Sequence, residues 1–242
     1  MRTPRAAITP LKLVNANCSG SSTGRCRIDK RLTPAARNHF YAALQAASPE
    51  PRSELVYHSP YQLLVAVILS AQATDKSVNA ATAKLFELAP DAPAMLRLGL
   101  PGLKRHIRTI GLYNSKAKHI IAATRLLLER HDGQVPADRA ALEALPGVGR
   151  KTANVVLNAA FGEATIAVDT HIFRVANRSG LAPGRTPRAV EDALLAVTPA
   201  QFRLHAHHWL LLHGRYVCKA RRPDCARCIV RRWCAYPDKT SP

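Results

Sequence analysis

The sequence predicts an all-α protein. Helical signals run along most of the chain: short apolar segments at helical spacing, begun by capping residues and ended by glycine or proline. Runs that alternate with the two-residue period of a strand are almost absent. The predicted helices cover 34–47, 60–69, 75–88, 94–98, 103–109, 115–131, 139–144, 149–161, 170–178, 187–197 and 199–212. Because each is short, packing rather than intrinsic propensity must stabilise them.

Local residues bound the first three helices. Thr33 can cap the first helix, with a proline in its first turn, and this helix ends before Pro49. Pro60 opens the second helix, which is apolar throughout. Thr74 can cap the third, and Pro90 halts it.

Glycines separate the later helices. Those in the middle of the chain are Gly102, Gly111 and Gly133. Asp138 can cap the short helix that Pro146 and Gly147 end. The next helix starts near Gly149, and Gly162 closes it. The layout of 110–117 (IGLYNSKA) resembles that of 146–153 (PGVGRKTA), which suggests two loops of similar build.

The charge indicates a polyanionic partner. The 242 residues include 35 Lys and Arg against 16 Asp and Glu, a formal net charge of +19. Nucleic acid is the commonest partner of such a protein, although a proteome rich in arginine would also give a basic chain. With 47% hydrophobic residues the bulk of the chain is globular.

The N-terminal segment differs in composition from the rest. Residues 1–32 contain Arg, Ser and Pro, with Asp29 as the only acid. We expect a basic, disordered tail here; an organellar transit peptide has a similar composition and is the alternative. No apolar run is long enough to cross a bilayer.

The stretch LPGVGRKTANVVL, residues 145–157, is typical of an anion site. A nucleotide-binding phosphate loop fails, because Ala144 replaces its first glycine, Arg150 separates Gly149 from Lys151, and a helix precedes the turn. A helix–hairpin–helix fits better. Its glycines, Gly147 and Gly149, bring the backbone of the hairpin and of Val148 close to an anion, and the free N–H groups of the next helix face a DNA phosphate. An ordinary turn between helices would need only one glycine.

Lys151 is unusual in the first turn of a helix, where the helix dipole repels a cation. This repulsion, the neighbouring Arg150 and partial burial are expected to lower the pKa of Lys151. An amine with a lowered pKa is a nucleophile, although a lysine that only contacts phosphate is the alternative. Asp169 can act as an N-cap, and beside a reactive lysine its carboxylate could accept a proton or stabilise positive charge on a sugar.

Four cysteines crowd the C-terminus with the spacing C-x6-C-x2-C-x5-C: Cys218, Cys225, Cys228 and Cys234. Such a group suggests a metal centre more than disulfides, and either zinc or an iron–sulfur cluster satisfies it. The segment is also basic, through Lys219, Arg221, Arg222, Arg227, Arg231 and Arg232. These side chains could offset the charge of a cluster, contact phosphates, or do both.

These motifs together resemble those of the endonuclease III family of DNA glycosylases and abasic-site lyases, in the helix–hairpin–helix superfamily. The matching stretches are 69–75 (LSAQATD), 110–117, 145–157, 168–178 (VDTHIFRVANR), 207–218 (HHWLLLHGRYVC) and the cysteine spacing. The resemblance covers nearly everything from about residue 34 onward, and excludes Cys18 and Cys26.

The resemblance implies a mechanism and a cofactor. Lys151 matches the lysine that attacks C1′ and forms a Schiff base before β-elimination, and Asp169 matches the assisting carboxylate. Gln72 and Leu112 match residues that enter the duplex, and the basic loop with Lys219, Arg221 and Arg222 matches a DNA-contacting loop. A 4Fe–4S cluster on the four C-terminal cysteines is implied, as are oxidised pyrimidines and abasic sites in double-stranded DNA as substrates.

The resemblance also implies the architecture. A six-helix barrel domain over 53–163 carries the hairpin, and an iron–sulfur cluster domain is formed by 33–52 and 164–242. We expect a monomer in the bacterial cytoplasm, associated with the nucleoid. The related adenine glycosylases typically lack the lysine and carry an additional C-terminal domain. A non-catalytic DNA-binding module would have no use for both Lys151 and Asp169.

Overall fold

The computed structural model describes residues 31–240, and in this range the chain is helical without a strand. The predicted all-α class is therefore confirmed. The elements are α1 (Pro34–Ala47), α2 (Pro60–Ser70), α3 (Asp75–Leu88), α4 (Ala92–Ile107), α5 (Tyr113–His131), α6 (Arg139–Glu143), α7 (Arg150–Phe161), α8 (Thr170–Ser179), α9 (Pro187–Val197), the 3-10 turn η1 (Ala200–Phe202) and α10 (Arg203–Tyr216). Residues 1–30, with Cys18 and Cys26, lie outside the described range.

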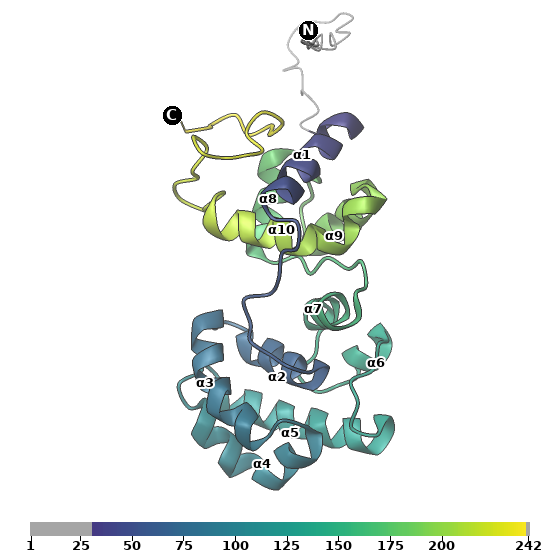
Figure 1. Ribbon diagram of the computed structural model, residues 1–242, viewed down its shortest axis with the longest axis vertical. Coiled ribbons are helices and arrows are strands. Elements are labelled where there is room, and N and C mark those ends of the chain that lie inside the picture. The colour runs from purple at the N-terminus through teal and green to yellow at the C-terminus, as the bar shows by residue number, and fades with distance from the viewer. Residues whose placement is uncertain (1–30, 241–242) are drawn as a thin grey trace, which may run out of the picture.

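The helices form two groups along the long axis of the molecule (Figure 1). One group contains α2 to α6 and the other contains α1, α8, α9 and α10, with α7 between them. Each group has its own hydrophobic cluster: Leu63 and Leu103 are fully buried in the first, Phe40 and Leu210 in the second. The two-domain architecture is thus confirmed, while the boundaries at 53–163 and at 33–52 with 164–242 stay a prediction.

The second cluster draws on both ends of the described chain. Leu32, the last residue of the predicted tail, is buried, and its N–H donates a 2.8 Å hydrogen bond to the carbonyl oxygen of Gly180. Val230, from the cysteine segment, is buried in the same cluster. Sequence-distant segments therefore build this domain jointly.

Side-chain caps begin most of the helices. Each cap accepts a backbone N–H of the first turn, which removes one unsatisfied donor. The capping residues are Thr33, Ser59, Thr74, Asp91, Asp138, Asp169 and Thr186. Among the described helices, α5, α7 and α10 begin without such a cap, and α10 continues directly from η1. The open starts of α5 and α7 matter for the site described below.

Two predicted regions differ in the structure. The segments predicted as 94–98 and 103–109 form the single element α4, because Asp91 caps it from Ala92 onward and the chain bends at Gly99 (φ 69°, ψ 173°) instead of leaving the helix. A non-glycine residue rarely adopts this φ. At the other end, the helix predicted over 199–212 is η1 followed by α10, which continues to Tyr216.

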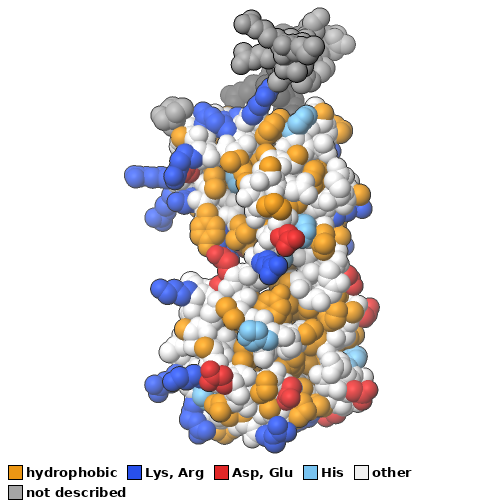
Figure 2. Space-filling view, viewed as in Figure 1, with side chains coloured by type: hydrophobic (Ala, Val, Ile, Leu, Met, Phe, Trp, Pro, Cys, Tyr) orange, Lys and Arg blue, Asp and Glu red, His pale blue; other side chains and the backbone are white. Residues whose placement is uncertain are grey.

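Lys and Arg side chains project along the left edge of the molecule in Figure 2, beside both helical groups. In the described part of the chain, no helix combines the length and the apolar character that crossing a membrane requires.

Candidate active site and nucleic-acid interface

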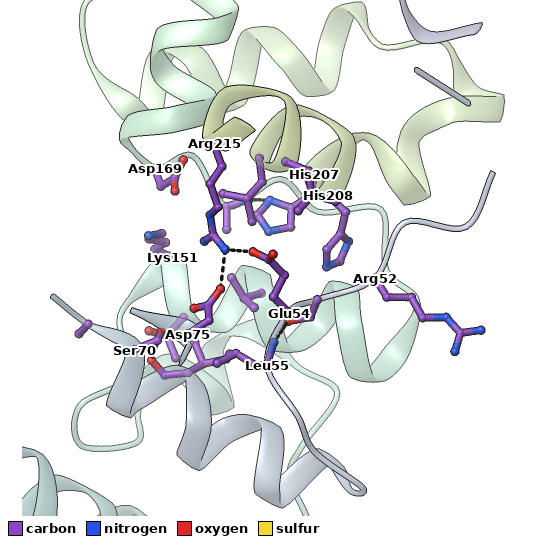
Figure 3. Close-up of a pocket in the computed structure, with 18 of the residues that line it drawn as sticks. Arg52, Glu54, Leu55, Ser70, Asp75, Lys151, Asp169, His207, His208 and Arg215 are labelled. Carbon is purple, nitrogen blue, oxygen red and sulfur yellow. Dashed lines mark hydrogen bonds and ion pairs between the residues drawn. The ribbon is translucent and has the colours of Figure 1, made fainter. Parts of the chain in front are cut away.

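A pocket lies at the waist of the molecule, between the two helical groups (Figure 3). Its walls come from the segment before α2, the end of α2 and start of α3, the first turn of α7, the start of α8, and α10. Polar residues of this lining include Glu54, Gln72, Asp75, Lys151, Asp169 and Arg215. The pocket therefore brings together Lys151 and Asp169, the two residues predicted to be catalytic.

Lys151 is the second residue of α7 and is exposed at the pocket. The expectation of partial burial is wrong, because the first turn of α7 projects beyond both hydrophobic clusters. Its amine forms no hydrogen bond or ion pair within residues 31–240, and α7 starts at Gly149 without a side-chain cap. The unfavourable position of a cation at this helix start is therefore not offset by a carboxylate partner in that range.

Asp169 both caps a helix and faces the pocket. Its Oδ1 accepts hydrogen bonds from the backbone N–H groups of His171 (2.9 Å) and Ile172 (2.8 Å). Its other oxygen, Oδ2, has no hydrogen-bond partner in the described part of the chain. Figure 3 shows the carboxylate on the same side of the pocket as Lys151. The cap holds the carboxyl group in place and leaves one oxygen for chemistry.

The turn between α6 and α7 is the predicted hairpin. The N–H of Val148 donates to the carbonyl oxygen of Leu145 (3.0 Å), and the Val148 side chain is buried. Gly147 has φ 82°, and a Cβ there would lie 2.8 Å from the Cβ of His119, so only glycine fits. A Cβ at the exposed Gly149 would meet nothing within 4 Å, which leaves its backbone open to an approaching anion.

A second exposed loop pair lies beside the hairpin helix layer. Gln72 (φ 56°) and Leu112 (φ 58°) both have left-handed backbone conformations, which are uncommon for residues other than glycine. Leu112 is 62% exposed although it is a large apolar residue. A Cβ at Gly111 would lie 3.9 Å from the carbonyl oxygen of Gln72, so the two loops are neighbours. Strained, exposed residues of this kind mark a functional surface more often than a structural one.

The pocket also contains polar residues that the sequence motifs did not single out. Arg215 donates to Asp75 (2.6 Å) and to Glu54, which joins α10, α3 and the segment before α2 (Figure 3). The Asp75 position lay within a matched motif, but nothing local marks Glu54. His207 lines the pocket and is buried; its Nδ1 accepts from the N–H of Ala167 (3.3 Å). Burial, with smaller contributions from the charges of His208 and Lys151, lowers the pKa of His207 to about 3, so this ring is neutral.

The four C-terminal cysteines line one small cavity with apolar neighbours such as Phe40 and Val230. All four are free thiols, so no disulfide links them. Within residues 31–240, no three His, Cys, Asp or Glu side chains form a group that could hold a single metal ion. Burial raises the pKa of Cys228 to about 11, so its thiolate needs a positively charged ligand. Four thiols around one cavity, without a single-ion site in that range, fit a group larger than one ion.

Two arginines of α8 hold the backbone of the cysteine segment. Arg174 donates to the carbonyl oxygens of Cys218 (2.8 Å) and Gly214 (2.7 Å). Arg178 donates to those of Lys219 (2.7 Å) and Ala220 (2.8 Å). The loop that follows Cys218 is therefore fixed through its backbone.

Exposed cations remain on this fixed loop. Lys219, Arg221 and Arg222 are exposed. Arg227 instead pairs with Asp224 (2.7 Å), and Arg231 donates to the carbonyl oxygens of Cys225 and Thr240. Of the basic residues in this segment, Arg227 and Arg231 therefore have internal partners, while the first three are presented to solvent.

Comparison with known proteins follows the same pattern. Residues 65–200 match the HhH-GPD superfamily base excision DNA repair protein family. The chain is 59% identical over 208 residues to endonuclease III of Escherichia coli (strain K12), covering 86% of this chain and 99% of that protein. It is 61% identical over 194 residues to endonuclease III of Treponema pallidum (strain Nichols), covering 80% and 92%. A solved structure of a trapped endonuclease III–DNA covalent intermediate superimposes with a TM-score of 0.78 at 40% identity, covering 84% of this chain and 96% of that one.

Proposed function

The chain belongs to the endonuclease III family, within the HhH-GPD superfamily of base excision DNA repair proteins, and on this basis we propose how its own residues divide the work. The protein is a DNA glycosylase with associated abasic-site lyase activity, and its partner is double-stranded DNA that contains oxidised pyrimidines or abasic sites. Lys151 is the nucleophile and Asp169 the assisting carboxylate. The observation that carries this assignment is that both line one pocket, where the amine and one carboxylate oxygen have no partner among the described residues.

The Lys151 ammonium must first lose a proton, which the free oxygen of Asp169 can accept directly or through water. The neutral amine then attacks C1′ of the damaged nucleotide as the bond to the base breaks, and the departing base takes up a proton. Opening of the sugar ring leaves an iminium between Lys151 and C1′. The Asp169 carboxylate stabilises the positive charge that develops on the sugar during these steps.

Strand cleavage follows from the same covalent intermediate. Loss of a proton from C2′ sends its electron pair toward the iminium, and the C3′–O bond breaks, with the 3′ phosphate as the leaving group. Water then hydrolyses the imine and returns the free amine of Lys151. The exposure of Lys151 gives DNA and water access to this nitrogen.

The exposed loops hold the DNA. The backbone of Gly147, Val148 and Gly149, with the uncapped first turn of α7, binds one phosphate. Gln72 and Leu112 enter the duplex where the damaged nucleotide leaves it, since both are exposed and lie on neighbouring loops. Phosphates farther along the strand contact the basic loop, through Lys219, Arg221 and Arg222.

Cys218, Cys225, Cys228 and Cys234 hold a 4Fe–4S cluster. Their shared apolar cavity and the lack of a single-ion site among residues 31–240 support this choice over zinc. When bound, the cluster joins the four cysteines into one rigid unit and so fixes the basic loop. Base excision and elimination need no electron transfer, so the reaction steps above use only protein side chains.

Borohydride trapping tests the assignment of Lys151. Wild-type protein incubated with abasic-site duplex and borohydride should form a covalent adduct, and Lys151→Gln should form none while it still binds the duplex. Lys84→Gln, an exposed lysine on α3, is the matched control and should be trapped like wild type. Adduct formation by Lys151→Gln would refute the assignment.

A further inference from the structure

Helix α7 carries a polar stripe on the face that meets the second domain. Arg150, Asn154 and Asn158 follow one another at intervals of four residues, so they lie on one side of the helix. Asn154 is 1% exposed and Asn158 is 5% exposed. The apolar residues of α7, such as Val156 and Leu157, belong instead to the first hydrophobic cluster. The same helix is thus held in one domain by apolar contacts and faces the other with polar ones.

The stripe finds partners in the second domain at both ends. Arg150 donates to the carboxylate of Glu191 on α9, through Nη2 (2.7 Å) and through Nε (3.0 and 3.2 Å to the two oxygens). Asn154 adds a 3.1 Å hydrogen bond to Glu191 Oε1. At the far end, Asn158 donates to the carbonyl oxygen of Leu204 on α10 (3.0 Å). Polar bonds therefore tie α7 to the domain that contains Asp169.

Glu191 has only 7% of its side chain exposed, so its negative charge depends on these donors. The planar guanidinium of Arg150 meets the carboxylate with two N–H groups, an arrangement that fixes direction as well as distance. Arg150 is consequently committed to Glu191. A basic residue next to a helix–hairpin–helix would otherwise be assigned to a DNA phosphate.

We propose that Arg150 and Glu191 are positioning residues, which set the direction of Lys151 relative to Asp169. Lys151 follows Arg150 directly in the first turn of α7, and Asp169 caps α8, which packs against α9. A bond from Arg150 to α9 therefore fixes the nucleophile against the carboxylate across the domain boundary. This inference rests on the roles proposed for Lys151 and Asp169.

Single-turnover trapping and DNA affinity together test the proposal. Glu191→Gln and Arg150→Met should each slow trapping on abasic DNA about 10- to 100-fold at saturating protein, well below the unfolding midpoint, because a small misplacement of a reacting group is costly. The Kd for an abasic-analogue duplex and its salt dependence should not change. Arg150→Lys should not restore the rate, because an ammonium lacks the fork. Asp192→Asn, at an exposed neighbour of Glu191, should behave as wild type.

A double variant separates positioning from stability. Replacing both partners, as in Arg150→Met with Glu191→Met, removes the unpaired charge and should raise the unfolding midpoint above that of Arg150→Met. Trapping should stay as slow as in the slower single variant. Recovery of trapping together with the midpoint would overturn the proposal, as would a salt slope that flattens by about one in Arg150→Met alone, which would make Arg150 a phosphate contact. Failure of the proposed function would show differently, as adduct formation by Lys151→Gln.

Discussion

The ammonium group of Lys116 donates a 2.6 Å hydrogen bond to the carbonyl oxygen of Ala71, the residue before Gln72. A second bond, of 2.8 Å, reaches the carbonyl oxygen of Leu69. The backbone N–H of Lys116 donates to the carbonyl oxygen of Leu112 (3.1 Å). One buried lysine on α5 therefore bonds to both loops that carry the left-handed residues Gln72 and Leu112, and at the same time satisfies carbonyl groups at the end of α2.

Replacing Lys116 by Met should destabilise the protein substantially. The methionine fills a similar volume but leaves two carbonyl oxygens without their donor, at about 1–3 kcal/mol for each buried group. We expect a decrease of roughly 2–4 kcal/mol in the free energy of unfolding, measured by urea titration. Lys118→Met, two residues along the same helix and exposed, should change it by less than about 0.5 kcal/mol. Equal decreases in the two variants would show that the buried bonds contribute nothing specific.

Two buried histidines should make the fold sensitive to mild acid. Burial lowers the pKa of His207 to about 3 and that of His208 to about 4, from the ordinary 6.5. The unfolded chain therefore binds protons that the folded chain does not, between pH 6.5 and about 4. Stability from these residues is fully present above pH 6.5 and falls as the pH decreases, by about 1.4 kcal/mol per pH unit for each histidine at most.

Denaturant titrations at pH 7, 6 and 5 check this prediction. His207→Gln and His208→Gln should each flatten the decline between pH 6 and 5, whatever they do to stability at pH 7. His119→Gln, an exposed position on α5, should leave the decline unchanged. A pH dependence that is the same in all three variants would place the acid sensitivity elsewhere.

Much of the fold could be predicted from the sequence because helix starts are local. Thr33, Thr74 and Asp138 cap helices in the structure as their positions beside apolar segments predicted. The kink at Gly99 was not predictable, because a glycine followed by a proline normally signals a break between helices rather than a bend within one. The hairpin and its uncapped helix were visible in the glycine spacing alone.

The candidate site divides in the same way. Lys151 and Asp169 stood out through their positions at helix starts, which is local information. Glu191 did not, because it lies 41 residues after Arg150 and only the packing of α9 against the start of α7 brings the two together. For the same reason Arg150 looked like a charge that would act on Lys151, whereas in the structure Glu191 pairs with it.

The cysteine cavity predicts iron in the purified protein. Protein isolated without oxygen should contain about four irons per chain and absorb broadly across the visible range. Cys228→Ala should lose this absorption and the iron. A variant with Cys18→Ser and Cys26→Ser should keep both, because these cysteines lie outside the predicted ligand set. Stoichiometric zinc in place of iron would refute the 4Fe–4S assignment.

The last prediction separates residues that hold the DNA backbone from residues that enter the duplex. Replacing Arg221 and Arg222 by Ala leaves the basic loop with up to two fewer cations against the DNA phosphates. The slope of log K against log salt should then flatten by roughly one for each phosphate that the loop no longer neutralises, whatever the DNA sequence. Arg188→Ala, on α9, removes a cation that is already paired with Asp192 and should leave the slope unchanged.

Gln72→Ala and Leu112→Ala should have the opposite signature. Neither side chain carries a charge, so neither releases counterions, and the salt slope should stay that of wild type. Extruding a nucleotide costs a few kcal/mol of unpairing and unstacking, which a side chain inserted into the vacated space partly offsets. Both variants should therefore weaken binding to an abasic-analogue duplex more than to undamaged DNA. If the arginine pair instead alters the preference for damaged DNA, while Gln72 and Leu112 alter the salt slope, the two roles are assigned the wrong way round.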